Sequence, residues 1–125
     1  MAVETALGAA IQNIVTDSEN DAKRAINFLK EKKGGRATFL PLTSVKSKPF
    51  TEKGLDDCYG FVDMADKLLD YDGKYNEIIQ SLLGRTAVAE DLDSAIAMAK
   101  KYSYRFKIVT LDGQVVNAGG SMTGG

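Results

Sequence analysis

Side chains able to do acid–base, nucleophilic or metal chemistry at neutral pH are scarce in this sequence. The 125 residues include no histidine and a single cysteine, Cys58. Without histidine, proton transfer and metal ligation through an imidazole are excluded. With one cysteine, neither an internal disulfide nor a zinc site built from several cysteines can form. Any chemistry would therefore rest on carboxylates, lysine, tyrosine or serine.

Carboxylates gather at three places: Asp56–Asp57, Asp63 with Asp66, and Glu90 with Asp91 and Asp93. Three carboxylates can hold Mg²⁺ or Ca²⁺, but the spacing does not follow the calcium-loop pattern. The last cluster stands where a helix cap is expected. A small ligand-binding or enzymatic α/β domain that uses these acids remains the alternative interpretation. We expect no catalytic residue, no metal site and no cofactor.

Positive charge is concentrated in one stretch. Residues 23–53 carry nine basic and two acidic residues, a net charge of +7, whereas the rest carries seven basic and fifteen acidic residues. Such asymmetry is typical of a surface that faces nucleic acid, and equally of a solvated helix face followed by a loop. The residues placed to contact DNA are Lys23, Arg24, Lys30, Lys32, Lys33 and Arg36.

The composition favours one soluble globular domain, with 44% hydrophobic and 26% charged residues. No apolar run approaches the roughly 20 residues of a membrane span, and no secretory signal opens the chain. The lack of disulfide potential suits the cytoplasm. We therefore expect a cytoplasmic protein without a membrane partner.

The first half of the chain reads as helix, strand, helix, strand. A helix ends within residues 3–10, and a strand follows over residues 11–16. Ser18 with Asp21 predicts a capped helix whose apolar stripe is Ala22, Ala25, Ile26, Leu29 and the adjoining Phe28. Gly34–Gly35 would end this helix, and residues 36–42 would form the second strand. Residues 43–58 look like a linker or mobile loop.

The second half repeats this order. A helix over residues 74–83 precedes a strand over 86–89, a helix capped by Asp91 or Asp93, and a strand over 105–111. Asp112–Gly113 predicts a hairpin turn into an uncharged returning strand over 114–117. An additional opening element, residues 60–65, has no counterpart in the first half. The chain is therefore expected to begin inside its first repeat, with a strand and part of a helix missing.

The predicted fold is α/β (α+β), with two pseudo-repeated subdomains of mixed sheet and helices in a single domain, residues 1–125. The first subdomain covers approximately residues 1–45, a linker loop 46–58, and the second subdomain 59–125. The chain ends in an uncharged segment with two glycine pairs, Gly119–Gly120 and Gly124–Gly125. Glycine pairs allow backbone conformations with positive φ, or allow another backbone to approach closely. A phosphate cradle usually needs a helix directly behind the loop, so a protein interface is favoured over it and over a flexible tail.

Several motifs together resemble a known family. They are Gly35–Leu42 (GRATFLPL), Leu83–Thr86 (LGRT) and Leu111–Gly125 (LDGQVVNAGGSMTGG), supported by Leu7–Gly8 and Ile11–Val15 (IQNIV). They cover nearly the whole chain, and the final fifteen residues are the most specific part. The sequence resembles the hinge domain of bacterial structural-maintenance-of-chromosomes (SMC) proteins.

This resemblance implies a doughnut-like homodimer that joins two antiparallel coiled-coil arms far from the ATPase heads, in a protein of chromosome condensation and segregation. The chain itself would not be an enzyme, because ATP and accessory subunits would bind elsewhere in the full-length, nucleoid-associated protein. Weak, non-specific DNA binding is associated with the basic surface of such hinges. The residues expected at the dimer interface are Val115, Val116, Gly119, Gly120, Met122, Gly124 and Gly125.

Overall fold

Two β-α-β units dominate the structure, a computed structural model that describes residues 2–125. In each unit a helix leads from one strand to a second strand that pairs with the first in parallel, as a crossover helix allows. The elements are β1 (Ile14–Thr16), α2 (Glu19–Lys32) and β2 (Phe39–Pro41) in the first unit, and β4 (Thr86–Ala89), α4 (Leu92–Lys101) and β5 (Lys107–Thr110) in the second. The predicted repeat of element order is therefore present.

Helices α2 and α4 begin in the same way. Ser18 and Asp91 are their N-caps, with nearly identical extended backbones (φ −148°, ψ 166° and φ −147°, ψ 172°). The backbone N–H of Asp21 donates to Ser18 Oγ over 3.2 Å, and that of Ser94 donates to Asp91 Oδ1 over 2.8 Å. The second bond favours the charged carboxylate and lowers the pKa of Asp91. Asp91 is thus the cap of α4.

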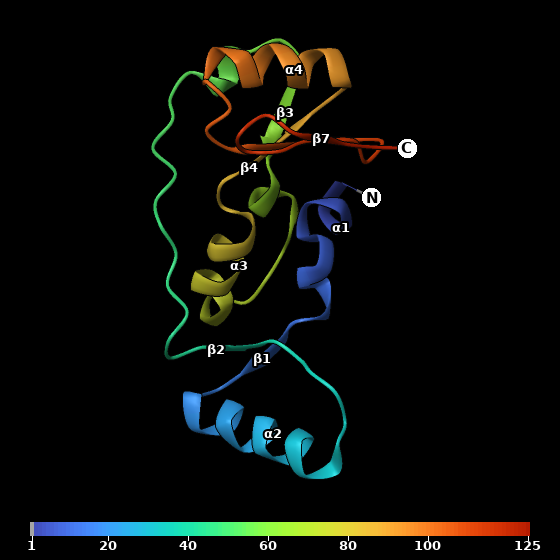
Figure 1. Cartoon of the computed structure of the whole chain (residues 1–125). Coiled ribbons are helices and arrows are strands. Elements are labelled where there is room, and N and C mark those ends of the chain that lie inside the picture. The colour runs from blue at the N-terminus through green and yellow to red at the C-terminus, as the bar shows by residue number, and fades with distance from the viewer. Residues whose placement is uncertain (1) are drawn as a thin grey trace.

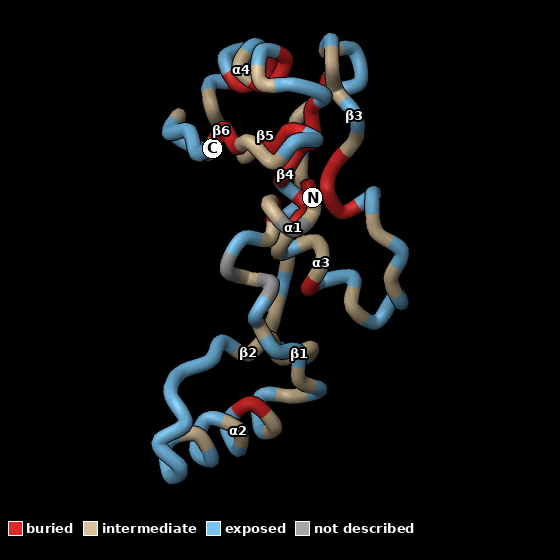
Figure 2. The backbone as a smooth tube through the Cα atoms, turned by 90° about the vertical axis from the view of Figure 1, so that its right-hand side faces the viewer, coloured by how far each residue is buried: buried red, intermediate tan, exposed pale blue. Residues whose placement is uncertain are grey.

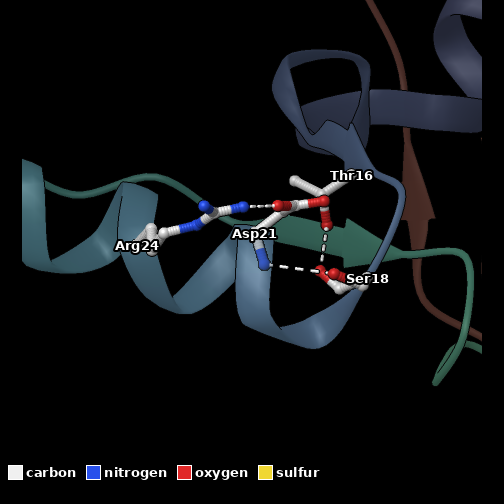
Figure 3. A network of polar contacts seen from close by, with 4 residues as sticks. All are labelled: Thr16, Ser18, Asp21 and Arg24. Atoms are coloured by element: carbon white, nitrogen blue, oxygen red, sulfur yellow. Dashed lines mark hydrogen bonds and ion pairs between the residues drawn. The ribbon is translucent and has the colours of Figure 1, made fainter.

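Figure 3 shows the first cap and its surroundings. The hydroxyl of Thr16, the last residue of β1, donates to the Ser18 carbonyl over 3.1 Å, and Arg24 forms an ion pair with Asp21 one turn into the helix. These contacts are local, because all four residues lie within nine positions of one another in the sequence. The start of α2 is therefore determined by its own segment.

Some boundaries in the first unit differ from the prediction. Helix α2 ends at Lys32, and its C-cap Lys33 is already left-handed (φ +53°) before the glycine pair is reached. The segment 8–12 forms a 3-10 helix, η1 (Gly8–Gln12), so that β1 has three residues rather than six. Residues 34–38 run into β2 without a partner strand. Both strands of this unit are short because they pair only with each other.

A five-stranded sheet organises the second unit. Its order is β3-β4-β5-β6-β7, with β3, β6 and β7 joined in antiparallel fashion. Helix α4 covers one face, and helices α1 and α3 cover the other (Figure 1). The remaining elements are α1 (Ala2–Leu7), η2 (Leu55–Asp57), β3 (Phe61–Met64), η3 (Ala65–Leu68), η4 (Gly73–Tyr75), α3 (Asn76–Leu83), β6 (Val115–Val116) and β7 (Met122–Thr123).

Alternation along the strands divides the core into two clusters. On β5, Ile108 faces α4, whereas Val109 faces α1 and α3; on β6, Val116 and Val115 divide in the same way. This is the period of two expected of a sheet covered on both faces. No helix within residues 2–125 combines the length and apolar character that a membrane crossing requires.

Helix α1 belongs by its contacts to the second unit. Ala2 and Ala6 are buried in the same cluster as Val109, and Lys107 Nζ donates to the Ala6 carbonyl over 3.2 Å. These residues were predicted to belong to the first subdomain. We call α1 together with residues 55–125 the body, and residues 13–45 the lobe. Figure 1 shows the lobe set apart from the body.

The lobe has almost no interior. Among residues 13–45, Ala22 is the single buried residue, and neither core cluster includes any residue of this range. Figure 2 shows the contrast, with burial concentrated in the body and one buried position on α2. The predicted apolar stripe of α2 is exposed at Ile26 and at the adjoining Phe28, which are 51% and 60% exposed. Two three-residue strands are too small to cover that helix.

Residues 46–54, which we call the strap, connect the lobe to the body along its side (Figure 1). They have no helix or strand, but hydrogen bonds and a ring contact join them to the body. Ser47 donates to Glu77 Oε2 from its backbone N–H over 2.7 Å and from its hydroxyl over 2.8 Å. These bonds lower the pKa of Glu77, because they favour its charged form. The lobe end of the strap is therefore tied to α3.

The other end of the strap docks near α4 and β5. The Phe50 ring meets that of Phe106 edge to face at 5.2 Å. Glu52 accepts two hydrogen bonds from Arg105, of 2.9 and 2.7 Å, which lower the pKa of Glu52 and raise that of Arg105. Tyr102 donates to the Lys53 carbonyl over 2.5 Å. Nearly all of these anchors are side chains of the body.

Candidate functional site

The uncharged strand after the hairpin turn lies inside the sheet. Val116 pairs with Ile108 of β5 on one side and with Met122 of β7 on the other. Val115 and Val116 are 7% and 1% exposed and contribute to the two core clusters. The predicted returning strand is therefore an inner strand of the sheet, and the contact of Val115 and Val116 with a partner stays a prediction. No pattern in the sequence predicts β7, because glycines surround its two residues.

Strand β7 is the free edge instead. Residues 121–125 are all exposed, and Met122 is 52% exposed. No residue from Gly113 to Gly125 is charged. Free edges usually carry charge, proline or a bulge that prevents pairing with another chain. An uncharged edge with an exposed methionine is a surface suited to a second protein chain.

The glycine-rich tail is held in place by side chains of β6 and its flanks. Asn117 Nδ2 donates to Thr123 Oγ1 over 3.2 Å. The side-chain amide of Gln114 pairs with the backbone of Gly125 as another peptide group would. Its Oε1 accepts from the Gly125 N–H over 3.0 Å, and its Nε2 donates to the Gly125 carbonyl over 3.4 Å. A Cβ at Gly124 would lie 2.0 Å from Gln114 Oε1. The tail is thus a defined edge within the described structure.

The first glycine pair has a different role. Gly119 and Gly120 have φ values of +90° and +107°, and the Gly119 N–H donates to the Tyr104 carbonyl over 2.8 Å. L-residues rarely adopt these conformations. This pair is needed to make the turn that brings β7 back beside β6. Whether the pair also contacts a partner stays a prediction.

The lobe offers a second open surface. Each strand of its two-stranded sheet has a free edge among the described residues. Ile14 and Val15 on β1 are 45% and 40% exposed, in addition to Ile26 and Phe28 on α2. A groove of about 410 Å³ runs beside this helix, lined by Ile26, Leu29, Lys30, Gly35, Arg36 and Ala37. Sequence periodicity predicts the apolar face of α2 but does not show that this face is exposed.

The six basic residues predicted to contact DNA are all exposed. They lie on α2 and in the segment directly after it. Arg24 is engaged by Asp21, whereas Lys30 and Lys32 stand in the last turn of the helix, where cations suit the helix dipole. The structure therefore places them on the lobe, away from β7, as a solvent-facing set.

The acidic clusters do not form a common site. Asp56 and Asp57 are exposed in η2, and Asp91 is occupied as a helix cap. Asp66 is buried and accepts a 2.7 Å hydrogen bond from Gln80 Nε2. Across residues 2–125, no three acidic or cysteine side chains come close enough to hold a metal ion. The arrangement offers surfaces for macromolecules more readily than a site for chemistry.

Comparison with known sequences identifies relatives. Residues 1–99 match the family model described as the SMC proteins flexible hinge domain. Chromosome partition protein Smc of Bacillus subtilis (strain 168) is 44% identical over 127 residues, which cover 99% of this chain and 11% of that protein. The same-named protein of Methanocaldococcus jannaschii is 41% identical over 124 residues, covering 99% and 10%. The chain spans about a tenth of the length of these relatives.

Solved structures of SMC hinge domains are also similar to this chain. An asymmetric dimer of the Geobacillus stearothermophilus SMC hinge domain matches with a TM-score of 0.93 and 48% identity, over 99% of this chain and 52% of that one. The Pyrococcus furiosus SMC hinge domain matches with a TM-score of 0.81 and 31% identity, over 99% and 62%. The mixed α/β fold predicted from the sequence is confirmed by these likenesses. The chain belongs to the SMC hinge domain family.

Proposed function

We propose that this chain is the dimerisation hinge of a chromosome-organising SMC ATPase. It joins two coiled-coil arms and performs no reaction itself, while ATP and accessory subunits bind other parts of the full-length protein. Its place of work is the cytoplasm, at the nucleoid. The observation that carries this proposal is the free, uncharged β7 edge of the body, in a family where a relative of 48% identity is a dimer.

The distribution of open surfaces explains how two copies would close on each other. The β7 edge lies on the body, and the exposed apolar side chains of the lobe lie elsewhere on the same chain. Two different patches that pair across a two-fold axis produce two equivalent contacts and a closed ring. Backbone groups along β7 supply hydrogen bonds, and Met122 supplies apolar area. A ring of two chains agrees with the doughnut shape that the family resemblance implies.

A charge on β7 is expected to separate the two copies. In the Met122→Glu variant, an unpaired carboxylate would have to be buried at the contact, which costs several kcal/mol. Light scattering over a dilution series should show the mass falling from twice the chain mass to a single chain mass. The matched control is Val62→Glu on β3, the opposite edge of the sheet. A Met122→Glu chain that stays dimeric, with Val62→Glu also dimeric, would exclude β7 as the interface.

Met122 is a better test position than the first glycine pair. Gly119 and Gly120 have positive φ, so any side chain there strains the turn whether or not a partner is present. Met122 already carries a side chain that points outward, and its replacement leaves the backbone unchanged. Loss of the dimer in this variant therefore reports on the contact itself.

Weak binding of DNA is a second proposal, supported by the exposed basic set on the lobe. Such binding depends on neutralised phosphates and falls steeply with salt. Reversing Lys30, Lys32 and Lys33 to glutamate should reduce the slope of log affinity against log salt by about 3, roughly one for each lost phosphate contact. Fluorescence anisotropy with duplex DNA between low and moderate salt measures this slope.

The control for the DNA experiment reverses three lysines of the body, Lys67, Lys74 and Lys100, so that the net charge is the same. If the lobe binds DNA, this control keeps most of the slope. Equal losses in both triple variants would show that overall charge alone attracts DNA. No binding by the unaltered chain at low salt would end the proposal.

A further inference from the structure

A groove of about 470 Å³ lies between helix α4 and the turn that precedes β3. We call it the α4 groove. Cys58 and Tyr59 of the turn and Ala97 of the helix are among the residues that line it. Met98 also lines it and is 2% exposed, so its side chain forms an apolar floor. The volume is within the roughly 300–1,000 Å³ of ligand pockets in proteins.

Negative charge surrounds the α4 groove. Five acidic residues line it or lie within two positions of its lining in the sequence: Asp56, Asp57, Glu90, Asp91 and Asp93. All five are exposed, and neither ion pair found among the described residues involves any of them. Lys101 is the one basic residue among the described residues that line the groove. The groove therefore combines an apolar floor with carboxylates that have no cationic partner.

The carboxylates keep their charge, and the lysine does not offset it. The Ser94 N–H donates to Asp91, which lowers the pKa of this carboxyl because the bond favours its charged form. Lys101 instead donates to Cys58 Sγ over 3.8 Å, and its Nζ lies 5.6 Å from the centre of the Tyr102 ring. An incoming cation would therefore find the carboxylates available.

Tyr59 adds an aromatic surface to the same groove. Its side chain is 88% exposed. The backbone that carries it is fixed, because Gly60 has φ +80° and its carbonyl accepts from the Glu90 N–H over 2.7 Å. The face of an aromatic ring attracts cations. Tyr59 thus favours the same kind of group as the carboxylates around it.

We propose that the α4 groove binds a basic segment of a partner protein, in which arginine or lysine alternates with apolar residues. The aliphatic part of a long cationic side chain packs on Ala97 and Met98. Its charged end lies beside Asp93 and the Tyr59 ring. Charge complementarity selects this partner over a nucleic acid, whose phosphates the carboxylates would repel.

This binding surface is separate from the two surfaces proposed above. The turn before β3 lies at one edge of the five-stranded sheet, and β7 is the opposite edge. Figure 1 shows α4 at the other end of the molecule from α2, which carries most of the basic set. The inference therefore requires neither the dimer nor DNA binding.

Fluorescence anisotropy with a labelled octapeptide of alternating arginine and leucine tests the inference on the whole chain. Tyr59→Ala and Asp93→Asn should each weaken binding by about 3-fold, the size of an exposed cation–π contact or ion pair. Ala97→Phe should abolish binding, because the ring occupies the groove. All three positions are exposed, and circular dichroism verifies that the variants remain folded.

The matched control is Asp70→Asn, which removes the same charge from the exposed segment between η3 and η4. It should leave the affinity unchanged. Equal losses in Asp70→Asn and Asp93→Asn would mean that overall acidity attracts the peptide, and the inference would be wrong. It would also be wrong if the unaltered chain did not bind the peptide.

The thiol of Cys58 shows whether the peptide occupies the groove. Cys58 lines the groove and is the single cysteine of the chain, so its rate of alkylation by iodoacetamide reports on this place alone. Peptide at ten times its dissociation constant should slow the reaction about 10-fold, because about a tenth of the chains remain free. Duplex DNA should leave the rate unchanged. Protection by DNA, or peptide binding with an unchanged rate, would overturn the inference.

Discussion

Replacing Gly60 with alanine is expected to destabilise the body by about 3 kcal/mol, more than any other single methyl group added at its glycines. Gly60 has φ +80°, and a Cβ there would lie 2.2 Å from Ser94 Oγ and 2.4 Å from Ser94 Cβ. The hydroxyl can rotate, but Ser94 Cβ is fixed in the first turn of α4. The turn at Gly60 cannot move away from α4 either, because the Gly60 carbonyl accepts a hydrogen bond from the Glu90 N–H over 2.7 Å.

Substitutions at two other glycines separate the cost of the positive φ from the cost of the contact with Ser94. Gly8 has φ +55° but no atom within 4 Å of an added Cβ, so Gly8→Ala should cost about 1 kcal/mol for the backbone alone. Gly73 has neither feature, so Gly73→Ala should lie within about 0.5 kcal/mol of the unaltered chain. Urea unfolding at one fixed protein concentration measures all three. A Gly60→Ala chain no less stable than Gly8→Ala would show that the contact with Ser94 is relieved.

Truncating Phe106 to alanine is expected to cost about 3–5 kcal/mol and to release the strap. Phe106 is 3% exposed, and its ring contacts those of Phe50 at 5.2 Å and Tyr102 at 5.4 Å. The substitution therefore leaves a cavity in the α4-side cluster. It also removes the ring that Phe50 of the strap contacts.

Two measurements separate these consequences. Urea unfolding gives the loss of stability, and limited trypsin digestion after Lys46 and Lys53 reports strap release under native conditions. The control is Tyr59→Ala, an aromatic truncation at a residue 88% exposed, which should change stability by no more than about 0.5 kcal/mol. If Phe106→Ala unfolds more easily while strap cleavage is unchanged, the polar contacts around Glu52 hold the strap without Phe50.

The second β-α-β unit was predictable because its signals are local. Strand β4 covers residues 86–89 as predicted, since all four residues are apolar or small and all are buried. Asp91 caps α4 through a bond to Ser94, three residues away. The turn at Asp112–Gly113 follows from Gly113, which has φ +86°. Each of these features depends on residues close together in the sequence.

The lobe surface and the strap were not predictable for the opposite reason. Periodicity shows that one face of α2 is apolar, but not whether this chain has enough structure to cover Phe28. The strap depends on pairs such as Glu52 with Arg105, which are 53 residues apart. Strand β7 was missed because glycines surround its two residues, and its backbone pairing with β6 is supported by the side chains of Gln114 and Asn117.

The packing of α1 determines when the body can be completed. Ala6 meets Lys107 across 101 residues of sequence, and the same helix packs beside Val109. Contacts of such separation form slowly, because a long loop must close before they stabilise anything. We therefore expect the contiguous segment from α3 to β5 to fold first and α1 to dock onto it afterwards. During synthesis on the ribosome, we therefore expect the apolar face of α1 to stay partly uncovered until β5 has emerged, although η3 and α3, which it also contacts, are made earlier.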